Sequence, residues 1–181
     1  MDLIKKLDAN GILFMSTKFP RNKVFDTLSI IINKIGYGGI MWLFLATFLL
    51  LFTPYKNYGL MIILADFLYY LLCAKIIKPN FSRKRPFQQD ETIQIIINKP
   101  KSSSFPSGHS TIAFSCTIIL FFMNPIVGCL ALILSLVIAF SRVYLLIHYP
   151  SDVILGSIIG LCIGLLSYFI INFIIYIIFL I

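Results

Sequence analysis

The sequence contains one polar stretch in a strongly apolar setting, Ser-Arg-Val-Tyr-Leu-Leu-Ile-His-Tyr-Pro-Ser-Asp at residues 141–152. Arg142 and Asp152 are the only formally charged residues among the last 80 of the chain, and His148 between them is one of only two histidines. Ionisable groups are expensive to keep among apolar residues, so by default they mark a site. Pro150 interrupts the apolar pattern, and a last helix is expected to begin just after it.

The other histidine, His109, belongs to a second polar segment, Ser-Phe-Pro-Ser-Gly-His-Ser at residues 104–110. The Pro-Ser-Gly-His part stands at the start of an apolar run, where a helix is expected to begin. Free backbone N–H groups at a helix N-terminus bind anions. The second segment is therefore predicted to offer an anion-binding helix start with a histidine in its first turn.

The composition indicates a membrane protein. Of the 181 residues, 59% are hydrophobic and only 12% are charged, and the mean hydropathy is +0.95. Several apolar runs reach or approach the ~20 residues that cross a bilayer as a helix. These features predict an all-α fold, a polytopic bundle of transmembrane helices.

The net charge of +8 does not indicate a nucleic-acid partner. Fourteen of the fifteen Lys and Arg residues precede residue 102, in segments that flank or connect the apolar runs. Basic residues in such places contact lipid headgroups or set the topology, so the expected partner is the phospholipid bilayer. The cysteines lie singly within apolar runs, without metal-ligand spacing, and all four are predicted to be buried apolar residues: Cys73, Cys116, Cys129 and Cys162.

Five membrane crossings are predicted, at about residues 36–53, 59–77, 108–124, 126–147 and 151–181. Before them, residues 1–35 mix apolar and basic positions in a way that suits short helices lying in the membrane interface. A sixth crossing, formed by residues 24–35, is the alternative. The chain is accordingly divided into an interfacial N-terminal segment, residues 1–35, and a transmembrane domain, residues 36–181.

The lengths of the connections place the polar segments on one side of the membrane. Short turns are expected at residues 54–58 and 124–125, and a long polar loop at 78–107. With this alternation, the N-terminal segment, the long loop and the turn at 148–152 share one membrane face. Within the loop, residues 93–97 suit either a strand or a re-entrant apolar patch.

The residues predicted to meet on this face suit phosphate chemistry. Three fixed cations, Lys78, Arg85 and Arg142, provide donors for a phosphate with two or more negative oxygens. His148 and Asp152 are four residues apart, so one helical turn would bring the carboxylate to the imidazole, fix the tautomer and leave the other ring nitrogen free to attack. The second histidine could then protonate a leaving oxygen. Each residue alone also has a structural explanation, and the site is indicated by their combination.

Three short motifs resemble those of a known family. They are Lys78-x6-Arg85-Pro86, Pro106-Ser107-Gly108-His109 and Ser141-Arg142-x5-His148-x3-Asp152. All three are complete and stand in the order and at the spacing of the signature motifs of the type 2 phosphatidic acid phosphatase (PAP2) superfamily. The resemblance extends from about residue 36 to the end of the last helix. It implies a PAP2/chloroperoxidase-like helical fold in which residues 36–181 form the catalytic domain.

The resemblance further implies a phosphatase that works through a phosphohistidine intermediate, without a metal or other cofactor. His148 corresponds to the nucleophile, Asp152 to the residue that orients it, and His109 to the general acid that protonates the leaving group. The implied phosphate-binding set is Lys78, Arg85, Ser107, Gly108 and Arg142. The sequence shows no His, Asp and Glu cluster at metal-ligand spacing, which agrees with this expectation.

A phosphatase embedded in the bilayer is expected to act on a lipid whose headgroup is a phosphate or a diphosphate. Undecaprenyl diphosphate is the leading substrate, because undecaprenyl diphosphatases are common among the small members of the family. Phosphatidylglycerophosphate, phosphatidic acid and lipid A phosphates remain open. The non-enzymatic alternative is a protein that binds or transports a lipid phosphate without cleaving it.

The expected location is the cell membrane, but two signals disagree on the side that carries the site. The positive-inside rule would place the basic loop and the N-terminus in the cytoplasm. The resemblance to the undecaprenyl diphosphatases favours the extracytoplasmic face, since the basic residues of the motifs are then explained by phosphate. We expect the extracytoplasmic face.

Two further features lie within the predicted spans. Asp66 is an intramembrane carboxylate that either pairs with Lys75 or an N-terminal lysine, or takes part in substrate or proton traffic. Gly156, Gly160 and Gly164 follow one another at four-residue intervals and are predicted to form a seam for close helix packing.

Overall fold

The computed structural model describes residues 2–19 and 21–180, and within these ranges all regular structure is helical. The α-helices are α1 (Asp2–Leu13), α2 (Lys23–Ile35), α3 (Ile40–Phe52), α4 (Lys56–Leu68), α5 (Lys78–Phe81), α6 (Pro86–Gln89), α7 (Gly108–Met123), α8 (Pro125–Tyr144) and α9 (Pro150–Leu180). Two π-helical segments, η1 (Phe14–Lys18) and η3 (Tyr69–Ile77), and a 3₁₀ turn, η2 (Tyr37–Gly39), complete the order. The predicted all-α class is confirmed.

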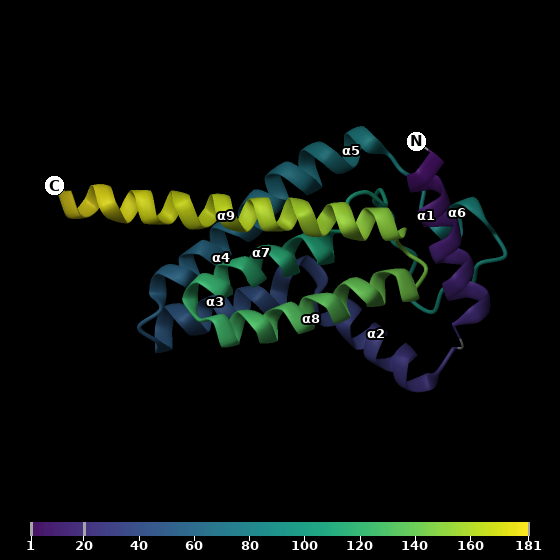
Figure 1. Ribbon diagram of the computed structural model, residues 1–181, viewed down its shortest axis with the longest axis horizontal. Helices are drawn as coiled ribbons and strands as arrows, with labels where there is room; N and C mark the ends of the chain where they lie inside the picture. The colour runs from purple at the N-terminus through teal and green to yellow at the C-terminus, as the bar shows by residue number, and fades with distance from the viewer. Residues whose placement is uncertain (1, 20, 181) are drawn as a thin grey trace.

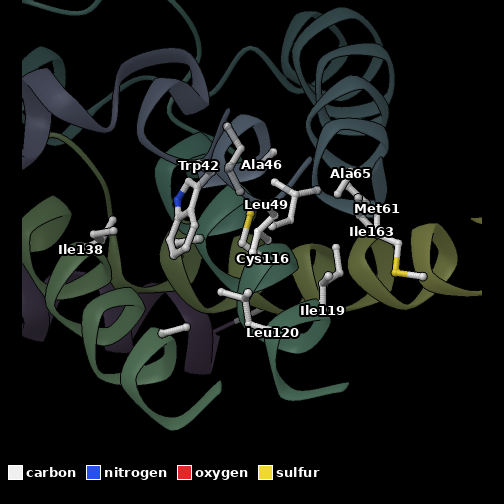
Figure 2. Packing of buried hydrophobic residues seen from close by; sticks show 14 of the residues in the cluster. Trp42, Ala46, Leu49, Met61, Ala65, Cys116, Ile119, Leu120, Ile138 and Ile163 are labelled. Atoms are coloured by element: carbon white, nitrogen blue, oxygen red, sulfur yellow. The ribbon is translucent and has the colours of Figure 1, made fainter. Parts of the chain in front are cut away.

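Helix α7 is the centre of the bundle. It packs against α8 and α9 and also touches α3 and α4, so that apolar side chains from several helices meet around it (Figure 1). Figure 2 shows this core, in which Cys116, Ile119 and Leu120 of α7 meet Trp42 of α3 and Met61 of α4. Because other helices surround α7, most of its side chains are buried.

The glycines of α9 form the predicted packing seam. A Cβ atom on Gly160 would lie 2.2 Å from the carbonyl oxygen of Thr111, and one on Gly164 would lie 2.4 Å from that of Ser115. Gly156, one turn earlier, lies against the backbone of Ser107 in the same way. Because these glycines carry no side chain, α9 can lie directly against the backbone of the first two turns of α7.

The polar segments lie together at one end of the bundle, as predicted. The turn between α8 and α9, the start of α7 and the loop that follows α6 are all found there, whereas the α3–α4 and α7–α8 turns lie at the opposite end (Figure 1). Helix α1 runs across this end rather than along the bundle (Figure 1). That orientation suits the predicted position of the N-terminal segment in the membrane interface.

The number of crossings stays a prediction. Three helical segments in the described ranges are long and apolar enough to span a membrane, Lys56–Gln89, Pro125–Tyr144 and Pro150–Leu180. The pair α2 and α3 would make a fourth if it is one span bent by 59°. Helix α7 is apolar but only 16 residues long.

Residues 93–97 form neither a strand nor a helix. Ile93, Ile95 and Ile97 are partly buried against a small cluster that includes Tyr144 and Ile147. The alternate isoleucines therefore cover the turn between α8 and α9 with an irregular loop. A strand needs a partner strand for its backbone groups, and the described chain offers none.

Candidate active site

A cavity of about 1110 Å³ opens at the polar end of the bundle. Both histidines of the chain line it, together with Lys78, Arg85 and Gly108. These five belong to the eight residues that the sequence predicts for the site. The structure thus brings together residues that are up to 70 positions apart, 78 and 148, around one space.

Three predicted site residues lie behind the cavity wall instead of lining it. Ser107, Arg142 and Asp152 are all fully buried. The hydroxyl of Ser107 shares a hydrogen bond of 2.9 Å with that of Ser110, and Arg142 donates to the side-chain oxygen of Asn33 at 2.9 Å. Since Asn33 does line the cavity, it stands between the guanidinium of Arg142 and the open space.

Three cations of the predicted site, Lys78, Arg85 and Arg142, have no carboxylate partner in the part of the chain that the structure describes. Lys78 donates to the carbonyl oxygen of Ser103 at 3.2 Å, and Arg85 donates to those of Ser102 at 3.0 Å and Ile147 at 2.7 Å. No ion pair joins Lys78, Arg85 or Arg142 to an acidic side chain within the described ranges. Carbonyl dipoles only partly offset such buried charge, so the cavity is suited to an anion.

The contacts of His148 fix its tautomer. Nε2 of its ring lies 3.2 Å from Nη1 of Arg85, and a guanidinium can only donate, so Nε2 is the acceptor and carries no proton. The proton therefore sits on Nδ1, which lies 3.7 Å from Oδ2 of Asp152. That separation is longer than a hydrogen bond, and Nδ1 has no other partner in the described chain. The unprotonated nitrogen, the one able to attack, faces the cavity cations.

Burial also keeps His148 neutral. The residue lies in the turn between α8 and α9, outside the membrane-spanning helices, with only 3% of its surface exposed. Burial lowers its pKa to about 3; the charges of Arg85 and Lys78 act in the same direction, whereas the carboxylate of Asp152 opposes them. A neutral imidazole is the form that a nucleophile requires.

Asp152 is held from several directions. Its Oδ2 accepts hydrogen bonds from the hydroxyl of Ser104 and from the backbone N–H of Tyr149, and its Oδ1 accepts from Arg83. Its backbone carbonyl oxygen accepts from the N–H of Ser107 at 3.1 Å. The predicted orienting residue thus ties the His148 turn to the segment that carries His109.

His109 occupies the first turn of α7 and faces the end of α2. Its Nε2 lies 3.4 Å from the backbone carbonyl oxygen of Asn33, at the edge of hydrogen-bonding distance. A Cβ atom on Gly36 would lie 2.9 Å from its ring, so the chain passes very close to it. His109 is therefore covered on one side by the N-terminal segment and opens to the cavity on the other.

Sequence reasoning missed four side chains that support this arrangement: Asp8, Asn33, Arg83 and Ser104. Arg83 forms ion pairs with both Asp8 and Asp152. Arg83 stands in the basic run 83–85, beside the motif residue Arg85, and this run is the signal that could have indicated it. Ser104 opens the polar segment 104–110, whereas Asp8 and Asn33 are single polar residues with no distinguishing pattern around them.

Asp66 forms neither of the predicted ion pairs within the described ranges. Its Oδ1 is buried and has no hydrogen-bond partner there. Gly39, with a φ of +76°, lies directly against it, and a Cβ atom on Gly39 would overlap that oxygen. Asp66 is not among the residues that line the cavity.

The state of His148 leads to a direct prediction. An ordinary histidine has a pKa of about 6.5 and is mostly protonated at pH 5, whereas His148 should remain neutral at that pH, with its proton on Nδ1. Nitrogen NMR of histidine-labelled protein in detergent checks this, and the His148→Gln variant assigns the signal because the chain has only two histidines. A midpoint for His148 near 6.5 would contradict the buried, neutral state.

Known proteins match both the sequence and the fold. The PAP2 superfamily profile matches residues 54–176. The undecaprenyl-diphosphatase of Sulfolobus acidocaldarius is 26% identical over 156 residues, which cover 86% of this chain and 75% of that protein. The decaprenylphosphoryl-5-phosphoribose phosphatase of Mycobacterium tuberculosis is 31% identical over 134 residues, 74% of this chain and 73% of that protein.

The fold comparison agrees with the sequence comparison. The crystal structure of Aquifex aeolicus LpxE superposes with a TM-score of 0.77 and 25% sequence identity, over 90% of this chain and 94% of the other. The profile match covers more than half of the chain and includes all three motifs. This protein therefore belongs to the PAP2 superfamily of phosphatases.

Proposed function

We propose that this protein removes a phosphate group from a lipid phosphate or diphosphate in the cavity, by way of a phosphohistidine and without a metal ion. One observation carries the proposal: the unprotonated Nε2 of His148 faces Arg85 in a cavity where Arg85 and Lys78 have no carboxylate partner within the described residues. A phosphate bound by Lys78 and Arg85 would accept the hydrogen bond that Nη1 of Arg85 now donates to Nε2 of His148, and this would free the lone pair of Nε2. Its phosphorus would then face the nucleophile.

The reaction has two steps. In the first, the lone pair of Nε2 forms a bond to phosphorus while the bond between phosphorus and the leaving oxygen breaks, and His109 gives that oxygen a proton. In the second, water attacks the phosphohistidine, His109 takes up a proton from the water, and inorganic phosphate leaves as the nitrogen–phosphorus bond breaks. Asp152 stabilises the positive charge that the imidazole gains in the first step.

The proposed substrate is undecaprenyl diphosphate. Two relatives support a polyprenyl lipid: one is named an undecaprenyl-diphosphatase and the other a decaprenylphosphoryl-5-phosphoribose phosphatase. The cavity suits such a molecule because its wall on the side of η3 is aromatic and apolar, with Tyr69, Tyr70 and Ala74. The first prenyl units could leave along this wall toward the bilayer while the diphosphate meets the cations.

Turnover tests the proposal. The purified protein in detergent, with EDTA present, should release inorganic phosphate from undecaprenyl diphosphate faster than from phosphatidylglycerophosphate, phosphatidic acid or lipid A phosphate. The His148→Asn variant should lose at least about 1000-fold in kcat, because it lacks the nucleophile. Lipid binding without phosphate release by the unmodified protein would establish a binding or transport protein instead, and release that requires a divalent metal would contradict the mechanism.

The role of His109 predicts a dependence on the leaving group. A diphosphate releases a phosphate monoester, which is a weaker base than the alkoxide released from a polyprenyl monophosphate and needs less help from an acid. The His109→Asn variant should therefore lose more activity on polyprenyl monophosphate than on the diphosphate. His148→Asn is the matched control and should impair both equally. Equal losses for His109→Asn on the two lipids would remove His109 from this role.

We place the active site on the extracytoplasmic face. The basic residues near it would favour the cytoplasm, but Lys78 and Arg85 line the cavity as predicted phosphate ligands, and Arg83 is paired with Asp8 and Asp152. They should therefore be discounted as topology signals. The α3–α4 turn with Lys56 lies at the opposite end of the bundle and would face the cytoplasm (Figure 1).

Labelling in intact cells checks this orientation. Cys73 and Cys116 are buried as predicted, but Cys129 and Cys162 are exposed and must be replaced by serine. A membrane-impermeant thiol reagent should then label Lys101→Cys and spare Lys56→Cys. Both lysines are exposed, so accessibility differs only through the membrane. Labelling of position 56 alone would place the site in the cytoplasm.

A further inference from the structure

Helix α1 carries one buried carboxylate at the active-site end of the bundle. Among the α1 side chains that the structure describes, only Asp8 is buried, with 4% of its surface exposed, whereas its neighbours Leu7 and Lys6 are exposed. A Cβ atom on Gly11 would lie 2.4 Å from Pro150, so α1 sits directly on the start of α9. An acidic residue is costly to bury unless its partners are well placed.

Asp8 finds those partners in α9 and in the basic loop. Its Oδ1 accepts from the backbone N–H of Ser151 at 2.9 Å, and its Oδ2 accepts from the hydroxyl of Ser151 at 2.7 Å and from Nη2 of Arg83. Asp8 therefore caps the N-terminus of α9 from another helix, and its charge is favourable at that end of the helix dipole.

Arg83 links Asp8 to the proposed orienting residue. One guanidinium nitrogen donates to Asp8, and the other donates to Oδ1 of Asp152 and to the hydroxyl of Ser151. The guanidinium also lies over the ring of Tyr149, 4.3 Å from its centroid. The contacts thus run from α1 through Arg83 to Asp152, whose second oxygen faces His148.

The net charge of these three side chains favours the attack of His148 on phosphorus. Asp8, Arg83 and Asp152 together carry one net negative charge beside an imidazole that becomes positive when it attacks phosphorus. Without the carboxylate of Asp8, Arg83 would neutralise Asp152 fully. Asp8 thus both aims Asp152, by fixing Arg83, and preserves the negative charge that favours attack.

We propose that Asp8 is a positioning residue of the active site, acting through Arg83 on Asp152, so that the N-terminal helix is needed for catalysis. Helix α1 lies outside residues 54–176, which match the family profile, and outside all three motifs. The inference rests on the proposed phosphatase function.

The test compares Asp8→Asn with a matched control, Asp26→Asn. Asp26 is also a carboxylate of the N-terminal segment bound to one arginine and one hydroxyl, those of Arg21 and Tyr144, but it makes no contact with Asp152. Asp8→Asn should lower kcat by about 10–100-fold, as changes to the outer partners of a reacting group do, with KM altered less than about threefold. Asp26→Asn should leave both constants near those of the unmodified protein.

A double-mutant cycle separates positioning from a general loss of structure. If Asp8 acts through Arg83, kcat of the Asp8→Asn/Arg83→Gln variant should fall far less than the product of the two single losses. Once one of the two residues is replaced, the contact from Asp8 through Arg83 to Asp152 is already lost, so replacing the other has little further effect. Apparent melting temperature and elution volume establish that each variant is folded. Should Asp8→Asn not be recovered, Asp8→Ser replaces it, since serine keeps an oxygen for the Ser151 amide and removes the charge.

The outcomes separate this inference from the function on which it rests. No turnover by the unmodified protein on any lipid would end the phosphatase proposal and this one with it. Turnover that Asp8→Asn leaves unchanged, a loss seen only in KM, an equal loss in Asp26→Asn, or multiplicative losses in the cycle would each refute the role of Asp8 alone.

Discussion

One buried carboxylate joins the two polar segments of an otherwise apolar chain. The backbone oxygen of Asp152 accepts the N–H of Ser107, and its side chain accepts the hydroxyl of Ser104 and the N–H of Tyr149. These bonds tie the turn that carries His148 to the loop that leads into His109. Without these bonds, the turn that carries His148 would not be fixed to the start of α7, which carries His109.

The packing of α9 against α7 helps to bring the two polar segments together. The glycine seam of α9 lets its first turns lie against the start of α7, which is where the two polar segments must meet. The helices also restrict the cations: Lys78 and Arg85 are held by backbone carbonyl oxygens of the loop at residues 102–103. Preorganised donors of this kind bind a phosphate without first giving up a carboxylate partner, so less binding free energy is lost to rearrangement.

Much of this arrangement could be predicted from the sequence because it depends on local patterns. Apolar runs of the right length predict the helices, and the alternation of short and long connections predicts that the polar segments share one end. The spacing of His148 and Asp152 predicts that they are neighbours, although at 3.7 Å they are farther apart than a hydrogen bond. The motifs also named Lys78 and Arg85, which line the cavity.

The remainder depends on contacts between distant residues that leave no local pattern. Asp8 meets Ser151 across 143 positions, and Arg142 meets Asn33 across 109. In the sequence, Asp8 is one acidic residue in an amphipathic segment, which suits a surface position as well as a buried one. The helical spacing also could not show that Arg142 lies behind the cavity wall, because that depends on how Asn33 of α2 covers it.

The most direct test of the central claim is a crystal structure with vanadate, which imitates a phosphate under attack. We expect vanadium bonded to Nε2 of His148, with its oxygens on Arg85, Lys78 and the backbone N–H of Gly108. Vanadate bound only to the exposed lysines of the loop, away from both histidines, would contradict it.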